Sequence, residues 1–207
     1  MFDFNKIIDA LKTDPDMQRT AGAGAAGLAA GVLLSGGGLG GLVKAGALAA
    51  IGGIAYSAWQ KSQQGGSEAS APLEVPPAGP FAPADQAGQE ALGKALVRAM
   101  IAAAKADGRI DAEEKERIFQ RLEDMNLSAE EKAFVFDELA SPLDLDAVVA
   151  GADTPEHAAE IYAASLVAIT ADTAAERAYL VTLSHKLRLD PALVREIHTT
   201  AGQPQPA

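Results

Sequence analysis

The sequence predicts an all-α protein whose C-terminal half is a bundle of about seven helices. From residue 90 onward the chain is rich in alanine and leucine and has few runs of β-branched residues, which favours helices over strands. Helix starts are marked by an N-cap residue followed three positions later by glutamate, and glycine or proline marks several boundaries. A little over a hundred residues can bury a modest core, so we expect residues 90–200 to fold as one domain.

Residues 1–20 predict a short amphipathic helix. Phe4, Ile7, Ile8 and Leu11 fall on one face at helical spacing. This face could lie on a membrane or pack on a partner. Four aspartates and the lack of a persuasive cleavage site make the stretch an unconvincing secretory signal.

Residues 21–59 form a Gly/Ala-rich apolar segment in which Lys44 is the one charged residue. Glycines recur four apart, which gives a helix a smooth strip on which another backbone can approach closely. The glycine run at 35–41 favours a break, so the segment predicts a helical hairpin of two apolar arms. We expect it to associate with a membrane, with Tyr56 and Trp59 near the interface. The alternative is a water-soluble, homo-oligomerising hairpin.

Residues 60–89 have the composition of a flexible, disordered linker. Proline, glycine, serine and glutamine dominate, and no apolar period persists. With such a linker, we expect the following domain to be able to lie at a distance from the membrane. Residues 201–207, after the last expected helix, predict a disordered tail.

The helices of the C-terminal domain are expected from their end signals. Gly108 is expected to stop the first helix, and Asp111 with Glu114 to start the second as N-cap and N3 residues. Thr173 opens another capping box, and Pro155 occupies the first position of a further helix. The expected helices are 91–106, 111–125, 128–140, 145–152, 154–170, 173–188 and a last one from 190.

Two helix-turn-helix units echo each other within this domain. Superposing Glu114 on Glu176 also pairs Asp107 with Asp172, once three residues are dropped from the loop. We expect the two units to pack as a pseudo-twofold repeat.

Two stretches carry a family resemblance: AAAKADGRIDAEEKERI at 102–118 and ITADTAAERAYLVTLSHKLRLDPALV at 169–194. They resemble the TerB-like family, named after tellurite-resistance proteins. With the apolar segment and linker in front, the whole chain resembles the DUF533 (YebE-like) group of bacterial inner-membrane proteins. The resemblance implies a seven-helix bundle with an acidic patch suspected of metal binding. It implies no established enzymatic activity.

A cluster of acidic residues is the candidate cation site. Its expected ligands are Asp107, Asp111, Glu114, Asp172 and Glu176. Carboxylate oxygens alone suit Ca²⁺, Mg²⁺ or Mn²⁺. The EF-hand loop does not fit, because Arg109 and Ala112 replace a ligand and the required glycine. The alternative interpretation is that these acids cap helices. Asp107 differs, because the helix dipole disfavours a carboxylate at the C-terminal end of a helix, so we expect a positive partner there, either Arg109 or a cation.

The composition narrows the function classes. The chain has no cysteine, which excludes disulfides, thiolate catalysis and Cys-based metal sites. Residues 90–207 hold twelve basic against twenty-one acidic residues, which disfavours nucleic acid as a partner. No nucleophile-base arrangement or phosphate loop can be singled out, so we expect no enzyme and no certain cofactor.

The leading functional hypothesis is a non-enzymatic, membrane-associated TerB-like interaction module. We place it in the bacterial inner membrane, with its C-terminal domain in the cytoplasm and a role in envelope or metal and chemical stress. Its protein partners cannot be identified from the sequence. The alternative hypothesis is a divalent-cation sensor that uses the acidic patch between the two helical repeats.

Overall fold

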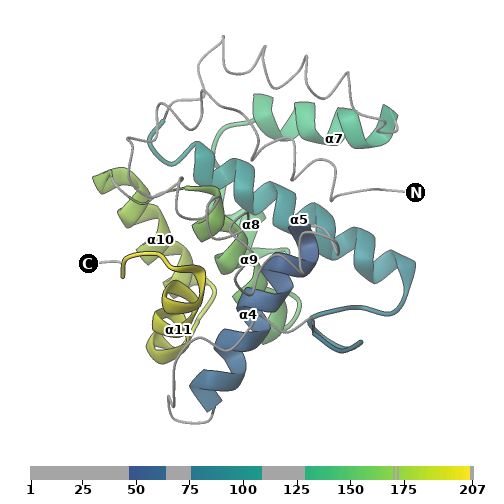
Figure 1. Cartoon of the computed structure of the whole chain (residues 1–207). Helices are drawn as coiled ribbons and strands as arrows, with labels where there is room; N and C mark the ends of the chain where they lie inside the picture. Colours follow the sequence, from purple (N-terminus) through teal and green to yellow (C-terminus); the bar gives the residue numbers. More distant parts are fainter. Residues whose placement is uncertain (1–46, 64–75, 109–128, 170, 172, 206–207) are drawn as a thin grey trace.

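The computed structural model of the chain describes residues 47–63, 76–108, 129–169, 171 and 173–205 (Figure 1). Within these ranges the chain forms seven α-helices and no strand, which confirms the all-α fold class. The helices are α4 (Ala47–Gln63), α5 (Gln86–Ala104), α7 (Ala129–Ala140), α8 (Leu145–Val149), α9 (Pro155–Ala168), α10 (Ala174–Lys186) and α11 (Pro191–Ala201). The helices expected at 1–20 and 111–125, and with them most of one predicted repeat unit, lie outside the described residues.

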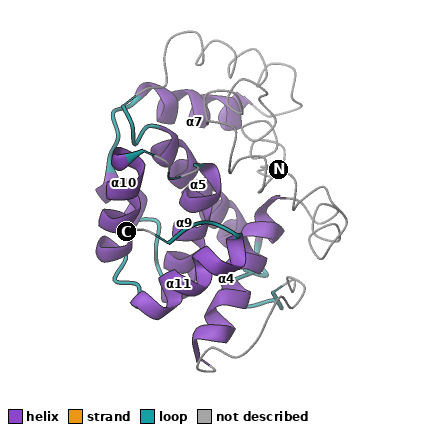
Figure 2. Cartoon of the chain, turned by 60° about the vertical axis from the view of Figure 1, so that its left-hand side comes forward, coloured by secondary structure: helices purple, strands orange, loops and turns teal. Residues whose placement is uncertain are grey.

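The helix α9 lies at the centre of the bundle. Its residues 158–166 are buried without a gap, as expected for a helix enclosed on all sides. It packs against α5, α4, α11 and α10, and Figures 1 and 2 show it between these helices. Four alanines in this run keep the helix thin, so its neighbours can approach closely.

Three N-caps are the residues that the sequence predicts. The Thr154 hydroxyl accepts a hydrogen bond from the backbone N–H three residues later at 3.1 Å, and the Asp190 carboxylate accepts one two residues later at 2.7 Å. Thr173 forms a full capping box with Glu176. These side chains satisfy N–H groups that the first turn of a helix leaves unpaired.

The helix α5 begins at Gln86, earlier than the expected start at 91. The Asp85 carboxylate accepts a hydrogen bond from the backbone N–H of Gly88 at 2.8 Å and so caps the earlier start. The end of the expected linker is therefore part of the helical domain.

The helix α4 contains the last residues of the expected membrane segment and packs inside the bundle. Ile51, Ile54, Ala55 and Ala58 are at most 6 % exposed and belong to the same hydrophobic core as α5 and α9. α4 contacts α9 and α11 (Figures 1 and 2). The sequence placed residues 21–59 apart from the helical domain, whereas 47–59 complete its core. Among the described helices, none has both the length and the hydropathy needed to cross a membrane.

A strap, residues 76–85, holds α4 from outside. Its Phe81 is buried and meets the rings of Tyr56 and Trp59 edge-on, at centroid distances of 5.5 and 5.9 Å. Gly79 and Ala82 exchange two backbone hydrogen bonds of about 3 Å, which close a tight turn. The expected flexible linker thus ends in an ordered contact with α4, and its residues 64–75 lie outside the described chain.

The C-terminal residues 202–205 also differ from the expected disordered tail. Gly202 takes a left-handed conformation with φ 68°, which ends α11 as a C-terminal glycine usually does. Gln203 is buried and donates its backbone N–H to the carbonyl of His198 at 2.9 Å. The chain therefore folds back onto α11.

Replacing Ile51 by alanine in the full chain tests whether α4 belongs to the core. The side chain is fully buried, so its truncation should lower the free energy of unfolding by about 2–4 kcal/mol. Urea denaturation followed by circular dichroism measures the change. Gln63→Ala, at the exposed end of the same helix, is the control. An unchanged midpoint for Ile51→Ala would show that the bundle folds without α4.

Candidate functional site

The structure describes two of the five predicted cation ligands. Asp107 is exposed in the turn after α5, beside Gly108, whose φ of 84° confirms a glycine-dependent turn there. The Glu176 carboxylate accepts hydrogen bonds from the N–H and hydroxyl of Thr173 at 3.0 and 2.9 Å. These two contacts are those of a capping residue.

The remaining predicted ligands, Asp111, Glu114 and Asp172, lie outside the described residues. In the part of the chain that the structure describes, no three His, Asp or Glu side chains are grouped as a metal site would require. The cation site therefore stays a prediction.

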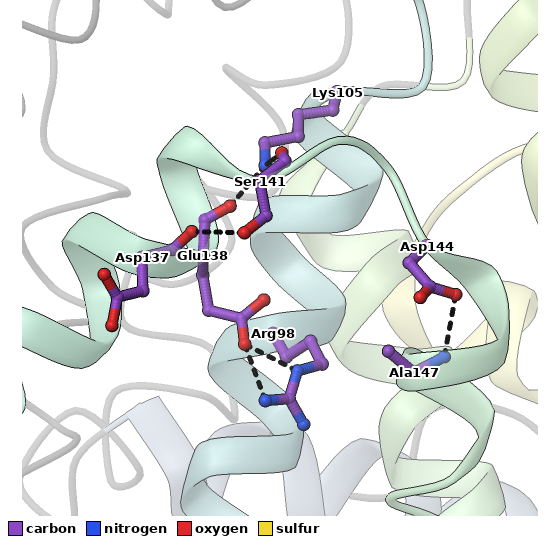
Figure 3. A network of polar contacts seen from close by, with 7 residues as sticks. All are labelled: Arg98, Lys105, Asp137, Glu138, Ser141, Asp144 and Ala147. Atoms are coloured by element: carbon purple, nitrogen blue, oxygen red, sulfur yellow. Dashed lines mark hydrogen bonds and ion pairs between the residues drawn. The ribbon is translucent and has the colours of Figure 1, made fainter.

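Lys105, in the same acidic stretch, fastens α7 to α5. Its ammonium donates hydrogen bonds to the backbone carbonyls of Glu138 and, at 2.6 Å, Ser141 (Figure 3). These carbonyls belong to the C-terminal end of α7, where a cation is favoured by the helix dipole. A lysine near a helix end is too common in sequences to predict this contact.

An ion pair supports α7 about two helical turns before Lys105. The Arg98 guanidinium donates through Nε and Nη2 to Glu138 Oε1 at 2.7 and 2.6 Å (Figure 3). It also lies 5.5 Å from the centroid of the Phe134 ring, a cation–π distance. Polar contacts therefore supplement the few buried side chains of α7, chiefly Val135 and Leu139.

Buried polar side chains on α9 are satisfied by its neighbours. The Tyr162 hydroxyl lies 2.8 Å from His198 Nε2, and His198 Nδ1 lies 2.5 Å from the Pro204 carbonyl. Burial lowers the pKa of His198, although the bond to Pro204 opposes this shift. Ser165 and Tyr179 share a 3.2 Å contact, and burial raises the pKa of Tyr179 to about 12. Each pair joins α9 to another helix.

Glu160 is the exception among these groups. It is 1 % exposed, and its Oε2 has no hydrogen-bond partner within the described residues. Burial first, and the negative charge of Glu156 second, raise its pKa to about 9, so the carboxyl is neutral at neutral pH. The sequence contains the signal, a lone charge within the apolar run 158–169, but nothing in the sequence shows that this run is enclosed on all sides.

A pocket of about 800 Å³ opens where the ends of several helices meet. The C-terminal end of α4, the start of α9 and the turn between α10 and α11 form its walls. Its apolar lining includes Trp59, Val149, Leu187, Leu189 and Leu193, and its charged lining is Asp153, Lys186, Arg188 and Asp190. An apolar pocket with a few charged groups is the usual form of a binding site.

Arg188 is held in a strained conformation at this pocket. Its φ is 54°, a left-handed value that costs a non-glycine residue about 1–2 kcal/mol. Its backbone N–H and that of Leu189 donate to carbonyls of α10 at 3.1 Å, which close the helix. Glycine normally occupies such a position. Here an exposed arginine occupies the position instead of glycine.

The other polar groups of the pocket mostly have structural partners. Lys186 forms a 2.6 Å ion pair with Asp146. Asp190 caps α11, and the Ser62 hydroxyl donates to the carbonyl of Trp59 at 2.8 Å. The pocket is therefore suited to recognition by shape and by the charges of Arg188 and Asp153.

Comparison with known proteins places the chain in one family. A family model described as "Protein of unknown function (DUF533)" matches residues 18–201. The chain is similar to a Yersinia enterocolitica protein described as "Uncharacterized protein in ampR 5'region", with 33 % identity over 115 residues. That match covers 56 % of this chain and 78 % of the relative. No solved structure matches the chain.

Lys105→Met tests the attachment of α7. The substitution keeps the aliphatic length but removes the positive charge at the end of α7. It should lower the free energy that holds this end of α7 in place by on the order of 1 kcal/mol. Amide hydrogen exchange in residues 137–140 should then accelerate about fivefold, while exchange in α9 stays unchanged. Lys186→Met, which removes an ion pair between α10 and α8, is the matched control. Unaltered exchange in α7 would mean that Lys105 does not hold it.

Proposed function

The chain belongs to the DUF533 family, and we propose that it is a non-enzymatic interaction module that holds a TerB-like helical bundle against the cytoplasmic face of the bacterial inner membrane. The packing of α4 carries this proposal. α4 begins directly after the apolar residues 21–46 and is part of the bundle core. Anchoring of 21–46 would therefore hold the bundle at the membrane surface, with no free tether between them. A role in envelope or chemical stress is part of the proposal.

The apolar residues 21–46 supply the anchor in this proposal. They contain Lys44 as their one charge, and their glycines recur four apart. Such spacing favours close pairing of apolar helices in a membrane, so the same residues could also join copies of the chain.

The pocket supplies the docking site for a protein partner. It lies at the C-terminal end of α4, whereas the anchor precedes the N-terminal end. A helix of this length spans about 25 Å, so the pocket would face away from the membrane. Arg188, an exposed cation in an acidic domain, favours a partner that presents an acidic group beside an apolar side chain.

Fractionation of cells tests the anchor. The full chain should sediment with membranes, and a fragment of residues 47–207, which keeps α4 and the whole described core, should stay in the supernatant. Leu33→Asp in the full chain should weaken membrane association, because an acid in the middle of a membrane segment costs about 3 kcal/mol. A full-length protein that remains soluble and monomeric would refute the anchor.

Arg188→Gly tests the docking site. Glycine adopts φ 54° without strain, so the variant should gain about 1 kcal/mol of stability. Partners captured by the wild-type fragment 47–207 should nevertheless be lost, since the cation at the pocket is gone. Arg195→Ala, which removes another exposed arginine outside the pocket, should leave capture intact. Equal capture by wild type and Arg188→Gly would exclude this pocket as the docking site.

A further inference from the structure

The Glu160 carboxyl lies where three segments of the chain meet. A Cβ built on Gly52 of α4 would stand 3.2 Å from Glu160 Oε1. The same point is 3.4 Å from the Pro76 side chain and 3.6 Å from the Phe81 carbonyl oxygen, both in the strap. α4 and the strap therefore cover the carboxyl from one side, and α9 carries it from the other.

α4 and the strap can lie this close to Glu160 only because residue 52 is a glycine and the carboxyl is neutral. Gly52 leaves no side chain between its backbone and the carboxyl, and a Cβ at 3.2 Å would already be tight. The fully enclosed Oε2 has no hydrogen-bond partner in the described chain. An ionised carboxylate without partners or water is strongly disfavoured in such a place, whereas a protonated carboxyl is tolerated. Its pKa near 9 follows from this burial and from Glu156, one turn earlier.

Among the described residues, no cation is a hydrogen-bond or ion-pair partner of the carboxyl. The titratable side chains on these elements are Tyr56 and Lys61 on α4, Asp85 on the strap, Glu90, Lys94 and Arg98 on α5, Glu176, Arg177, Tyr179, His185 and Lys186 on α10, and Arg195, Glu196 and His198 on α11. None of them is a hydrogen-bond partner of Glu160 Oε2. On α9 itself, Glu156 adds a like charge, and the Tyr162 hydroxyl is paired with His198.

We propose that Glu160 is a protonation-controlled latch, over which α4 and the strap dock only while its carboxyl is neutral. Loss of the proton drives α4 and the strap away from α9, because their separation is the route by which water can reach the charge. The bundle then loosens its hold on α4. The latch stands on the packing of α4 and does not require membrane association.

The direction of the pH effect follows from proton linkage. In the open state the carboxyl has an ordinary pKa of 4.5, and in the docked state it has a pKa of about 9. Between these values the open state has lost a proton that the docked state keeps. The ratio of open to docked molecules should therefore rise about tenfold for each pH unit in that interval. Docking is favoured on the acid side.

The absence of cysteine from the chain allows a direct test by thiol labelling. Ala55→Cys places a thiol on the buried face of α4, and Ala99→Cys places one on α5, where the carbonyl of residue 99 faces Ser165 and Tyr179. Labelling rates of the two full-length variants are compared from pH 6 to 8.5. Their ratio cancels the common pH dependence of thiolate formation. The ratio of α4 to α5 labelling should rise about tenfold per pH unit.

Glu160→Gln in the Ala55→Cys and Ala99→Cys backgrounds should make the ratio independent of pH, because an amide of the same shape does not titrate. Glu156→Gln removes the neighbouring charge without altering the core, so labelling of α4 should be unchanged at pH 6 and slower than in the parent at pH 8.5. If Glu160→Gln does not fold, Glu156→Gln alone tests whether the charge of Glu160 controls the docking of α4. A ratio that is flat in the parent, or that stays steep in Glu160→Gln, would overturn the latch. Parallel acceleration at both thiols would also overturn it, since the opening would then be global.

Discussion

The enclosure of α9 on all sides is the constraint on which the rest of the structure depends. A helix buried over nine consecutive residues needs small side chains to let its neighbours approach, and alanines supply them. It also needs every polar group it carries to meet a partner. Tyr162 and Ser165 meet this demand through His198 and Tyr179. Glu160 is the exception: its Oε2 has no hydrogen-bond partner among the described residues, and burial raises its pKa, so the carboxyl stays neutral at neutral pH.

The same enclosure confines the pocket to the ends of the helices. The sides of α9 are covered, so the pocket forms where α9 starts and α4 ends. The turn that carries Arg188 belongs to this region and holds backbone strain that a glycine would relieve. The packed sides of the helices stabilise the fold, whereas binding residues in proteins lie more often on the turns between helices. Lys105 and Arg98 hold α7 at the opposite end of the bundle (Figures 1 and 2), separate from the pocket.

Local signals in the sequence predicted the all-α class and much of the C-terminal helix pattern. Thr154, Thr173 and Asp190 cap the helices that they were expected to open, because capping depends on a few adjacent residues. The position of α4 could not be predicted, since a helix that is apolar all round suits either a protein core or a membrane. Tertiary contacts decide between these two environments, and 47–59 lie in the core. The acidic cluster is visible in the sequence because its residues lie close together. Glu160 is a single residue, and its unusual environment arises only from the packing around it.

The continuity between the apolar segment and the core changes how the two parts can act on each other. A flexible tether would let an anchor and a bundle behave independently. Here α4 follows residues 21–46 directly and supplies Ile51 and Ile54 to the same core as α9. In the proposed arrangement, any shift of the anchor along α4 must therefore disturb the packing over Glu160, since packed helices resist gradual deformation. By the same coupling, a change in the charge of Glu160 would alter how firmly the bundle is held at the membrane.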